Sequence, residues 1–304
     1  MSKTILITGA TGRQGGSVID SLLKQDADVE ILAVTRDATS TRAQNLANKS
    51  PKIKLIQGNL DQPGEIFDNA KKATSSSVWG VFSVQPTWLF WDSDSEEKQG
   101  KGLVDTALEN NVKHFVYTSA DRGGDGASLD TPSPIPNTIG KYNIEHHLIN
   151  RTEGTDMTWT ILRPVCFLDG TLEPGLIGKL SATTFKVAVG GRRLPVIAVS
   201  DVGYFGAQAF MKPDAYKGKG ISLAGDEISF DEMAKIFKSV TGKDVPTTFE
   251  FVSRLVMWII PNFGAIARWF GDGRLKADVS ALRKVHPGLK DFRSWLETES
   301  AWKR

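Results

Sequence analysis

Ile5-Leu6-Ile7-Thr8-Gly9-Ala10-Thr11-Gly12-Arg13-Gln14-Gly15-Gly16 is the stretch that decides the fold. A short apolar run breaks here into glycines, and residues 17–23 follow with helical spacing. Such glycines permit a tight turn, a close approach to a pyrophosphate and packing of a helix against a strand. The stretch therefore predicts a strand, a phosphate-binding turn and a helix that hold a dinucleotide. We expect cofactor contacts from Gly9, Thr11, Gly12, Arg13, Gln14 and Gly15.

Apolar runs alternate with helix-like segments through the first half of the chain. The expected strands cover residues 29–34, 53–56, 78–84, 112–118 and 157–162, and the expected helices 42–49, 65–72, 96–110 and 139–150. This alternation is typical of parallel strands joined by crossover helices. It predicts an α/β fold with a Rossmann-type, doubly wound parallel sheet.

The alternation loosens after Pro164, which predicts a smaller α+β lobe in the C-terminal half. We place the Rossmann domain at 1–165 and the smaller lobe at 166–304, and we expect the two to interleave through a strand near 221–223 that returns to the sheet. Glycines and prolines between Asp121 and Pro136 predict a long loop at the carboxyl edge of the sheet. The glycines and arginines of residues 190–193 lie in a hairpin-like run.

Composition excludes several classes of protein. The 37 basic and 35 acidic residues leave a net charge of +2, which gives no general attraction to nucleic acid or to an anionic membrane. A lone cysteine, Cys166, excludes an intrachain disulfide, and no cysteine and histidine cluster has the spacing of a zinc site. The first strand follows Met1 too closely for a signal peptide, so we expect a cytoplasmic location, with the nucleus as a second option.

The most apolar stretch of the chain covers residues 255–260 and ends at Pro261. It is too short to span a bilayer. We expect a lid or core helix of the C-terminal lobe. A helix lying on a membrane is the less favoured alternative, because the sequence shows no basic face beside the apolar one.

The end of the second expected strand indicates which dinucleotide binds. Arg36 follows this strand, about twenty residues beyond the last glycine of the turn. A guanidinium at this position can bind a 2′-phosphate in a forked geometry, which favours NADP(H). Asp37 is the counterargument, because turned inward it would accept hydrogen bonds from ribose hydroxyls and allow NAD. Arg13 and Arg42 are secondary candidates for the same phosphate.

These motifs together resemble the NmrA-like family, whose members are atypical short-chain dehydrogenase/reductases, and are similar to isoflavone reductase-like enzymes. The resemblance rests on residues 9–16, 35–37, 58–61 and 99–101, and on Lys141, Arg163, Pro164 and Phe167. It implies an NADP(H)-binding Rossmann domain with a small C-terminal lobe. It also implies cofactor contacts from Asn59, Leu60, Val84, Gln85, Lys141, Pro164, Cys166 and Phe167.

The catalytic pattern of ordinary short-chain reductases is incomplete here. The lysine of that pattern is Lys141, but Asn137 stands four residues earlier, where a tyrosine normally donates the proton. Asn137 can donate a hydrogen bond to a carbonyl oxygen but has no proton to give. Lys141 can act through a lowered pKa, and Ser119, at the carboxyl end of its strand, can polarise a substrate carbonyl. The alternative for Lys141 is a solvated helix lysine, and the alternative for Ser119 is a hydroxyl that caps the next segment. A surface or packing role is favoured for Tyr142, His146 and His147, and a buried small residue for Cys166.

Two functions remain open, because the family contains both working reductases and proteins that sense the NADP(H) redox state and bind transcription factors. We favour narrowly an NADPH-dependent reductase of a carbonyl, enone, imine or quinone, assisted by Lys141, Ser119 and Asn137. Aromatic side chains after the fourth strand and in the C-terminal lobe favour an apolar or aromatic substrate. A non-catalytic redox sensor with a protein partner is the alternative. The aromatic side chains after the fourth strand are Trp88, Phe90 and Trp91.

Overall fold

The computed structural model describes residues 2–86, 93–132 and 135–303, without the side chains of residues 93 and 136–138. The chain forms two compact units, and each unit is assembled from three separate segments. The first unit comprises Met1–Ser119, Asn137–Leu162 and Val202–Ile221. The second comprises Ala120–Pro136, Arg163–Asp201 and Ser222–Arg304.

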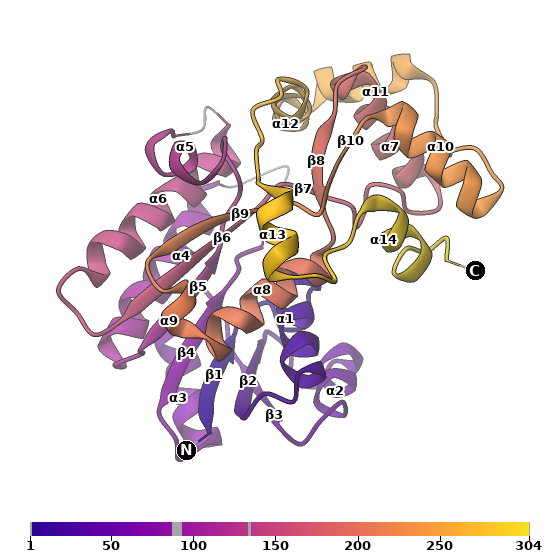
Figure 1. Ribbon diagram of the computed structural model, residues 1–304. Helices are drawn as coiled ribbons and strands as arrows, with labels where there is room; N and C mark the ends of the chain where they lie inside the picture. The colour runs from indigo at the N-terminus through magenta and orange to yellow at the C-terminus, as the bar shows by residue number, and fades with distance from the viewer. Residues whose placement is uncertain (1, 87–92, 133–134, 304) are drawn as a thin grey trace. The chain divides into compact units, whose positions relative to one another are not determined.

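A seven-stranded sheet forms the centre of the first unit (Figure 1), in the order β3-β2-β1-β4-β5-β6-β9. Neighbouring strands from β3 to β6 pair in parallel. Their apolar residues run almost without interruption, as expected for strands that are covered on both faces. This arrangement confirms the predicted doubly wound α/β fold. The strands are β1 (Lys3–Ile7), β2 (Val29–Thr35), β3 (Ile53–Gln57), β4 (Val78–Ser83), β5 (His114–Thr118), β6 (Thr158–Pro164) and β9 (Lys219–Leu223).

Helices cover both faces of this sheet (Figure 1). One face carries α1 (Arg13–Lys24), α2 (Thr41–Ala47) and α8 (Val199–Met211). The other carries α3 (Pro63–Ala73), α4 (Ser93–Glu109) and α6 (Pro136–Thr152), and their buried side chains form one apolar core with the strands. The short helix α9 (Pro213–Tyr216) leads into β9. Because the strands from β3 to β6 are parallel, their carboxyl ends lie at one common edge of the sheet, where loops can form a ligand site.

The second unit contains a three-stranded sheet in the order β10-β8-β7. In this sheet β7 pairs with β8 in parallel, and β8 pairs with β10 in antiparallel fashion. The strands are β7 (Cys166–Phe167), β8 (Leu194–Ile197) and β10 (Asp226–Ile228). The helices are α5 (Asp125–Asp130), α7 (Leu176–Val189), α10 (Phe230–Thr241), α11 (Glu250–Ile259), α12 (Pro261–Gly271), α13 (Val279–Val285) and α14 (Phe292–Thr298).

Two local expectations are wrong. The stretch from residue 121 to 136 is not one long loop, because it contains α5 and ends in the first residue of α6. Asp121 makes this helix possible, since its carboxylate accepts hydrogen bonds from the N–H groups of Gly123 and Gly124 and from the Ser128 hydroxyl. The run at residues 190–193 is not a hairpin, since it connects the end of α7 to β8.

Within the described residues, no single helix is long and apolar enough to cross a bilayer. The helices α11 and α12 reach that length and composition only when taken together, and they are bent by 119° at the break between them.

Candidate functional site

The glycine-rich turn between β1 and α1 is tied firmly to the end of β4. The N–H of Thr8 donates to the carbonyl oxygen of Phe82 over 3.0 Å. The N–H of Val84 donates to the Thr8 hydroxyl over 2.8 Å. Gly9 has a φ of +57°, and Gly15 packs so closely that an added Cβ would lie 2.4 Å from the Gly9 carbonyl oxygen. Glycine is therefore required at position 9 for conformation and at position 15 for space.

The turn forms one wall of a cavity of about 570 Å³ in the first unit. This volume falls in the range of about 300–1,000 Å³ that is usual for small-molecule and cofactor sites. Helix α1 begins at Arg13 and has no side-chain cap, because its N-cap residue is Gly12. A helix start of this kind favours an anion. The cavity is lined by Thr8, Gly9, Thr11, Gly12, Arg13, Gln14, Gly15, Val34, Thr35, Arg36, Gly58, Asn59, Leu60, Asp61, Val84, Gln85, Pro86, Ser95 and Gln99.

The cavity brings together most of the residues expected to bind the cofactor. It includes the six expected residues of the turn, and also Arg36, Asn59, Leu60, Val84 and Gln85. These come from the ends of β1, β2, β3 and β4, which lie side by side in the sheet. A site at the carboxyl ends of these strands agrees with the rule for open parallel sheets.

At the end of β2, Arg36 and Asp37 have different surroundings. Arg36 is exposed and lines the cavity. The carboxylate of Asp37 instead turns to its own loop and accepts the N–H of Thr39 over 2.8 Å and its hydroxyl over 2.6 Å. These hydrogen bonds from Thr39 hold the pKa of Asp37 below its ordinary value. The cation is therefore available to a ligand at this point, and the anion is already engaged.

Two amide side chains in the cavity wall have an acceptor that lacks a partner. Gln85 donates from Nε2 to Ser83 over 2.8 Å, and Gln99 donates from Nε2 to Asp61 over 2.8 Å. Their Oε1 atoms are buried, and among the described residues neither oxygen has a hydrogen-bond partner. Buried polar atoms are normally satisfied, so these two oxygens point to a ligand that carries donors.

Asp61 and Gln99 were not among the cofactor contacts expected from the sequence. Asp61 accepts hydrogen bonds from Gln99 and, over 2.9 Å, from Asn59, and these bonds lower its pKa. Both residues belong to motifs on which the family resemblance rests. That membership was the signal in the sequence that could have found them.

The sequence pattern of the NmrA-like family matches residues 1–285 of this chain. The chain belongs to the NmrA-like family. Its curated relatives include the NmrA-like family domain-containing oxidoreductase FrzB of Cladobotryum sp, which is 28% identical over 273 residues. That match covers 80% of this chain and 75% of FrzB.

Solved structures of similar fold include reductases and a transcriptional regulator. The reductases include the triphenylmethane reductase of Citrobacter sp. complexed with NADP(H), with 21% identity, a TM-score of 0.73 and coverage of 96% of this chain and 98% of that one. They also include the NADPH-dependent quinone oxidoreductase QOR2 of Escherichia coli complexed with NADPH, with 20% identity, a TM-score of 0.70 and coverage of 95% and 97%. The negative transcriptional regulator NmrA in complex with NADP has 17% identity, a TM-score of 0.70 and coverage of 99% and 96%. At these identities the likeness shows the fold alone.

Lys141, the lysine expected to assist catalysis in this NmrA-like chain, is engaged in a buried ion pair. Its ammonium contacts the carboxylate of Glu96 on α4, and the side chains are only 13% and 3% exposed. Glu96 was not expected from the sequence, because a carboxylate that begins a helix usually serves the helix itself. Lys141 does not line the cavity of the first unit. The pair joins the first turn of α4 to the second turn of α6.

The other expected catalytic residues are placed only in part. Ser119 is buried just beyond β5, where its N–H donates to the carbonyl oxygen of Leu162 over 2.7 Å. Asn137 lies in the first turn of α6, and its side chain is outside the description. Ser119 does not line the cavity. Trp88, Phe90 and Trp91, the aromatic residues expected after β4, lie outside the described residues.

Pro164, Cys166 and Phe167 belong to the second unit and do not line the cavity of the first. Cys166 is buried, and burial raises the pKa of its thiol to about 12. It is therefore a thiol and not a thiolate at neutral pH.

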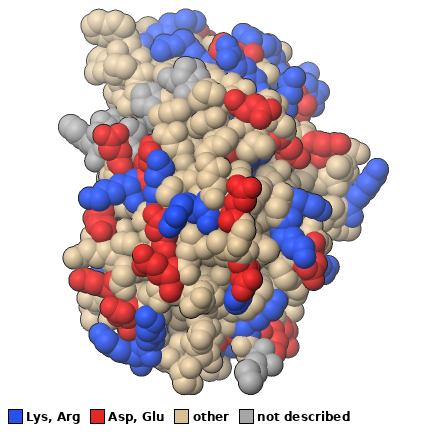
Figure 2. Space-filling model, turned by 90° about the vertical axis from the view of Figure 1, so that its left-hand side faces the viewer, with Lys and Arg blue, Asp and Glu red and all other residues tan. Residues whose placement is uncertain are grey.

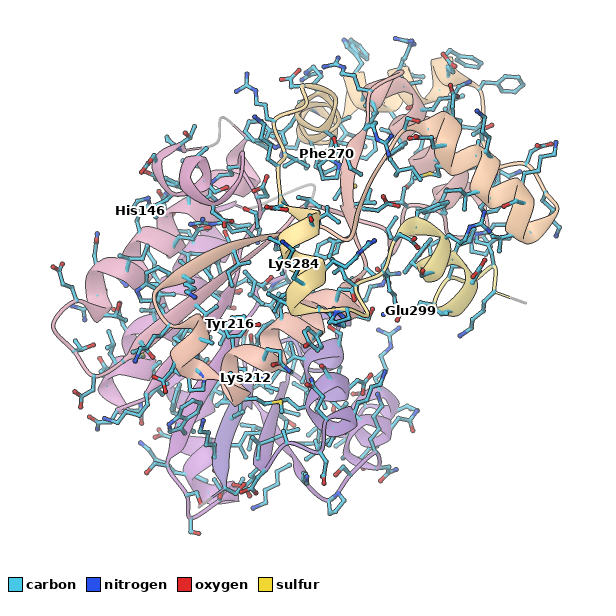
Figure 3. All side chains as sticks on the ribbon, in the orientation of Figure 1. His146, Lys212, Tyr216, Phe270, Lys284 and Glu299 are labelled. Atoms are coloured by element: carbon cyan, nitrogen blue, oxygen red, sulfur yellow. The ribbon has the colours of Figure 1, made fainter. Side chains whose placement is uncertain are left out.

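The histidines of α6 are engaged in packing and pairing. His146 extends from α6 (Figure 3), and its ring packs against that of Tyr142 with 4.2 Å between centroids. His147 lies 3.0 Å from Asp105. Within the part of the chain that the structure describes, no three His, Cys, Asp or Glu side chains are grouped to hold a metal ion.

Proposed function

We propose that this protein binds NADP(H) and uses NADPH to reduce a small apolar or aromatic molecule. The substrate classes that fit are a carbonyl, an enone, an imine or a quinone. The observation that carries the proposal is the end of β2, where Arg36 lines the cavity and Asp37 is held by Thr39. A cation favours a 2′-phosphate there, whereas a free carboxylate would favour the ribose hydroxyls of NAD.

The residues of the cavity fit the adenosine and pyrophosphate parts of the cofactor. The turn at Gly9, Gly12 and Gly15 leaves room for a pyrophosphate against the start of α1. Arg36, with Arg13 in the same wall, supplies forked donors for the 2′-phosphate. Gln99 Oε1 would accept from an amino group of the cofactor, and Gln85 Oε1 from a second donor. Both orphaned oxygens would then be satisfied.

Bound NADPH would supply a hydride to the acceptor, and a proton from the Lys141 ammonium, directly or through water, would complete the reduction. We assign Ser119 to polarising the acceptor oxygen, because it follows the carboxyl end of β5. Asn137 supplies a hydrogen bond but no proton. Lys141 supplies positive charge, and Glu96 fixes its position through their ion pair. The names of the triphenylmethane reductase and of the quinone oxidoreductase support an apolar, aromatic acceptor.

Calorimetric titration of NADPH and NADH into the Arg36→Ala variant tests the cofactor assignment. Loss of a hydrogen-bonded charge pair costs about 1.5–3 kcal/mol, so we expect NADPH affinity to fall about 10- to 100-fold while NADH affinity is unchanged. Arg192→Ala is the matched control, because this arginine is exposed, belongs to the second unit and does not line the cavity. An equal loss for both cofactors would refute the 2′-phosphate assignment.

A redox sensor that binds NADP(H) and a protein partner is the second candidate. Its supporting observation is the ion pair with Glu96, which already engages the ammonium of Lys141. The regulator NmrA has the same fold.

Incubation with NADPH and a panel of quinones, enones, ketones and triphenylmethane dyes separates the two functions by loss of NADPH absorbance. A reductase turns over at least one acceptor and is slowed by Lys141→Ala. A sensor turns over none, and calorimetry then shows different affinities for NADP and NADPH. The cytoplasmic location stays a prediction for both.

A further inference from the structure

The helix α11 presents its apolar side chains outward. Its buried residue is Ser253, whose hydroxyl lies 2.8 Å from that of Thr184 on α7. Phe251, Leu255 and Trp258 are exposed instead, and Trp258 is 79% exposed. An amphipathic helix normally turns this apolar face toward the core. The inversion therefore needs an explanation outside the packing of this unit.

The exposed apolar surface extends from α11 to the start of α7. Lys186 pairs with Glu250 over 3.0 Å, and Thr184 contacts Ser253, so residue numbers fall along α7 as they rise along α11. The two helices therefore run antiparallel, and the start of α7 lies toward the end of α11. Leu176 at that start is 84% exposed. We call the whole surface the elbow patch, and it consists of Leu176, Ile177, Phe251, Leu255, Trp258 and Ile259.

The segments that contain α7, α11 and α12 carry an excess of positive charge. Residues 176–189 and 249–276 carry six basic side chains against two acidic ones, a net charge of +4, while the whole chain has +2. Both acidic residues are paired. Glu250 lies 3.0 Å from Lys186 and 3.8 Å from Arg254, and Asp272 lies 3.7 Å from Arg274. Figure 2 shows Lys and Arg side chains, with Asp and Glu side chains among them, at the end of the molecule where α7, α10, α11 and α12 lie in Figure 1. The unpaired charge near the patch is therefore basic.

We propose that the elbow patch docks on a membrane surface that contains anionic phospholipid. Trp, Phe, Leu and Ile side chains on an exposed helix are suited to the boundary between head groups and acyl chains, where Trp is enriched. Exposed Lys179, Arg254 and Arg268 in the same helices would meet the lipid phosphates. A second copy of this chain fits less well, because a symmetric contact would oppose two basic rims.

This docking does not depend on the proposed reductase activity. A membrane surface would bring the protein close to apolar molecules dissolved in the bilayer. The basic rim also corrects the sequence-based argument that a basic face is missing, because its charges come from neighbouring helices and not from residues 255–260 alone.

Flotation with phosphatidylcholine vesicles, with and without 30% phosphatidylserine, tests the proposal on the full-length protein. We expect flotation with the anionic vesicles and its loss at high salt. Arg268→Ala should lower partitioning about five-fold, the effect of one basic charge near the surface. Trp258→Asp should lower it at least as much. Val285→Asp, at an exposed apolar position on α13, is the matched control and should float like the unchanged protein.

Two results would overturn the proposal. One is that the unchanged protein does not float, or that flotation falls equally in Trp258→Asp and Val285→Asp. The other is that the unchanged protein does not float but forms a dimer in light scattering, and that Trp258→Asp converts this dimer to a monomer. That result would assign the patch to a second copy. Calorimetric titration with NADPH verifies that each variant is folded. Because calorimetry measures cofactor binding and flotation measures membrane binding, a failure of docking is distinguishable from a failure of the cofactor assignment.

Discussion

Gly15 lies where a side chain has no room, since a Cβ would approach the carbonyl oxygens of Gly9 and Thr8 to 2.4 and 2.5 Å. Both oxygens belong to the backbone of the turn, so neither can rotate away. Overpacking of this kind costs about 1–3 kcal/mol. We expect Gly15→Ala to lower the stability of the protein by that amount and to weaken NADPH binding at least ten-fold, measured by urea unfolding and calorimetry.

Gly64→Ala is the matched control for that change. Gly64 lies in the first turn of α3, and a Cβ there would meet no atom within 4 Å. An alanine at such a helical position should raise stability by about 0.5–1 kcal/mol. Equal effects of the two substitutions would mean that close packing at the turn is not what requires glycine.

The second prediction concerns the buried ion pair of Glu96 and Lys141. Glu96→Gln keeps the shape of the side chain but leaves the ammonium of Lys141 without its counter-charge in a buried site. Breaking one side of a buried pair costs about 3–5 kcal/mol. We expect a loss of that size in urea unfolding. The neighbouring pair of Glu97 and Lys101 is more exposed, so Glu97→Gln should cost less, and a smaller effect at Glu96 than at Glu97 would contradict the prediction.

At the scale of an element, β5 carries a histidine that resists protonation. His114 is buried, and its ring nitrogens lie 2.8 Å from the Thr158 hydroxyl and 3.2 Å from the Thr160 hydroxyl. Burial, together with the charge of Lys3, lowers the pKa of His114 from 6.5 to about 4. The unfolded chain therefore binds a proton in this pH range that the folded chain does not. The free energy of unfolding must therefore fall as the pH drops through about 6.5. The contribution of His114 to this fall is complete only below about pH 4.

Urea unfolding at pH 7 and pH 5 measures this effect. Between these values His114 should account for a loss of about 2 kcal/mol. His114→Gln removes the titrating group, so this variant should lose about 2 kcal/mol less stability than the unchanged protein between pH 7 and pH 5. His147→Gln on α6 is the control, and its pH dependence should stay closer to that of the unchanged protein. An identical pH dependence in His114→Gln would show that this histidine is not the cause.

The elements themselves were largely predictable, because burial on both faces leaves a clear apolar run. The strand expected at 29–34 is Val29–Thr35, and the strand expected at 53–56 is Ile53–Gln57. The helix α5 was missed because Asp121 stabilises it through side-chain hydrogen bonds that no periodicity reveals. The cavity wall was predicted where it follows strand ends. Gln99 was missed as a contact because it reaches the cavity from the interior of α4.

At the scale of the whole molecule, Asp121 joins distant parts of the second unit. Its Oδ2 accepts the N–H of Lys276 over 2.8 Å, and its Oδ1 accepts the hydroxyl of Ser222 over 2.7 Å and the N–H of Gly124 over 2.9 Å. Asp121→Asn would replace one acceptor oxygen by an NH2 group, which would face these N–H and hydroxyl donors. Charged hydrogen bonds are worth about 1.5–3 kcal/mol each, so we expect a loss of at least about 3 kcal/mol in thermal or urea unfolding.

Asp130→Asn is the matched control, since Asp130 is exposed at the end of α5. It should change stability by less than about 0.5 kcal/mol. A comparable loss in both variants would indicate that charge, and not this network, stabilises the unit. Such long-range links could not be predicted, because nothing in the sequence pairs position 121 with position 276.

The alternation of the two units along the chain has a consequence for synthesis on the ribosome. The sheet of the first unit needs α8 and β9, and α8 packs so closely that a Cβ on Gly206 would lie 2.8 Å from Val18 and 3.3 Å from Phe82. These late segments emerge only after residues 120–136 and 163–201 of the second unit have been made. Residues 1–119 are therefore made before the helix that covers part of one apolar face of their sheet. During that interval a nascent chain of this protein would be a substrate for chaperones.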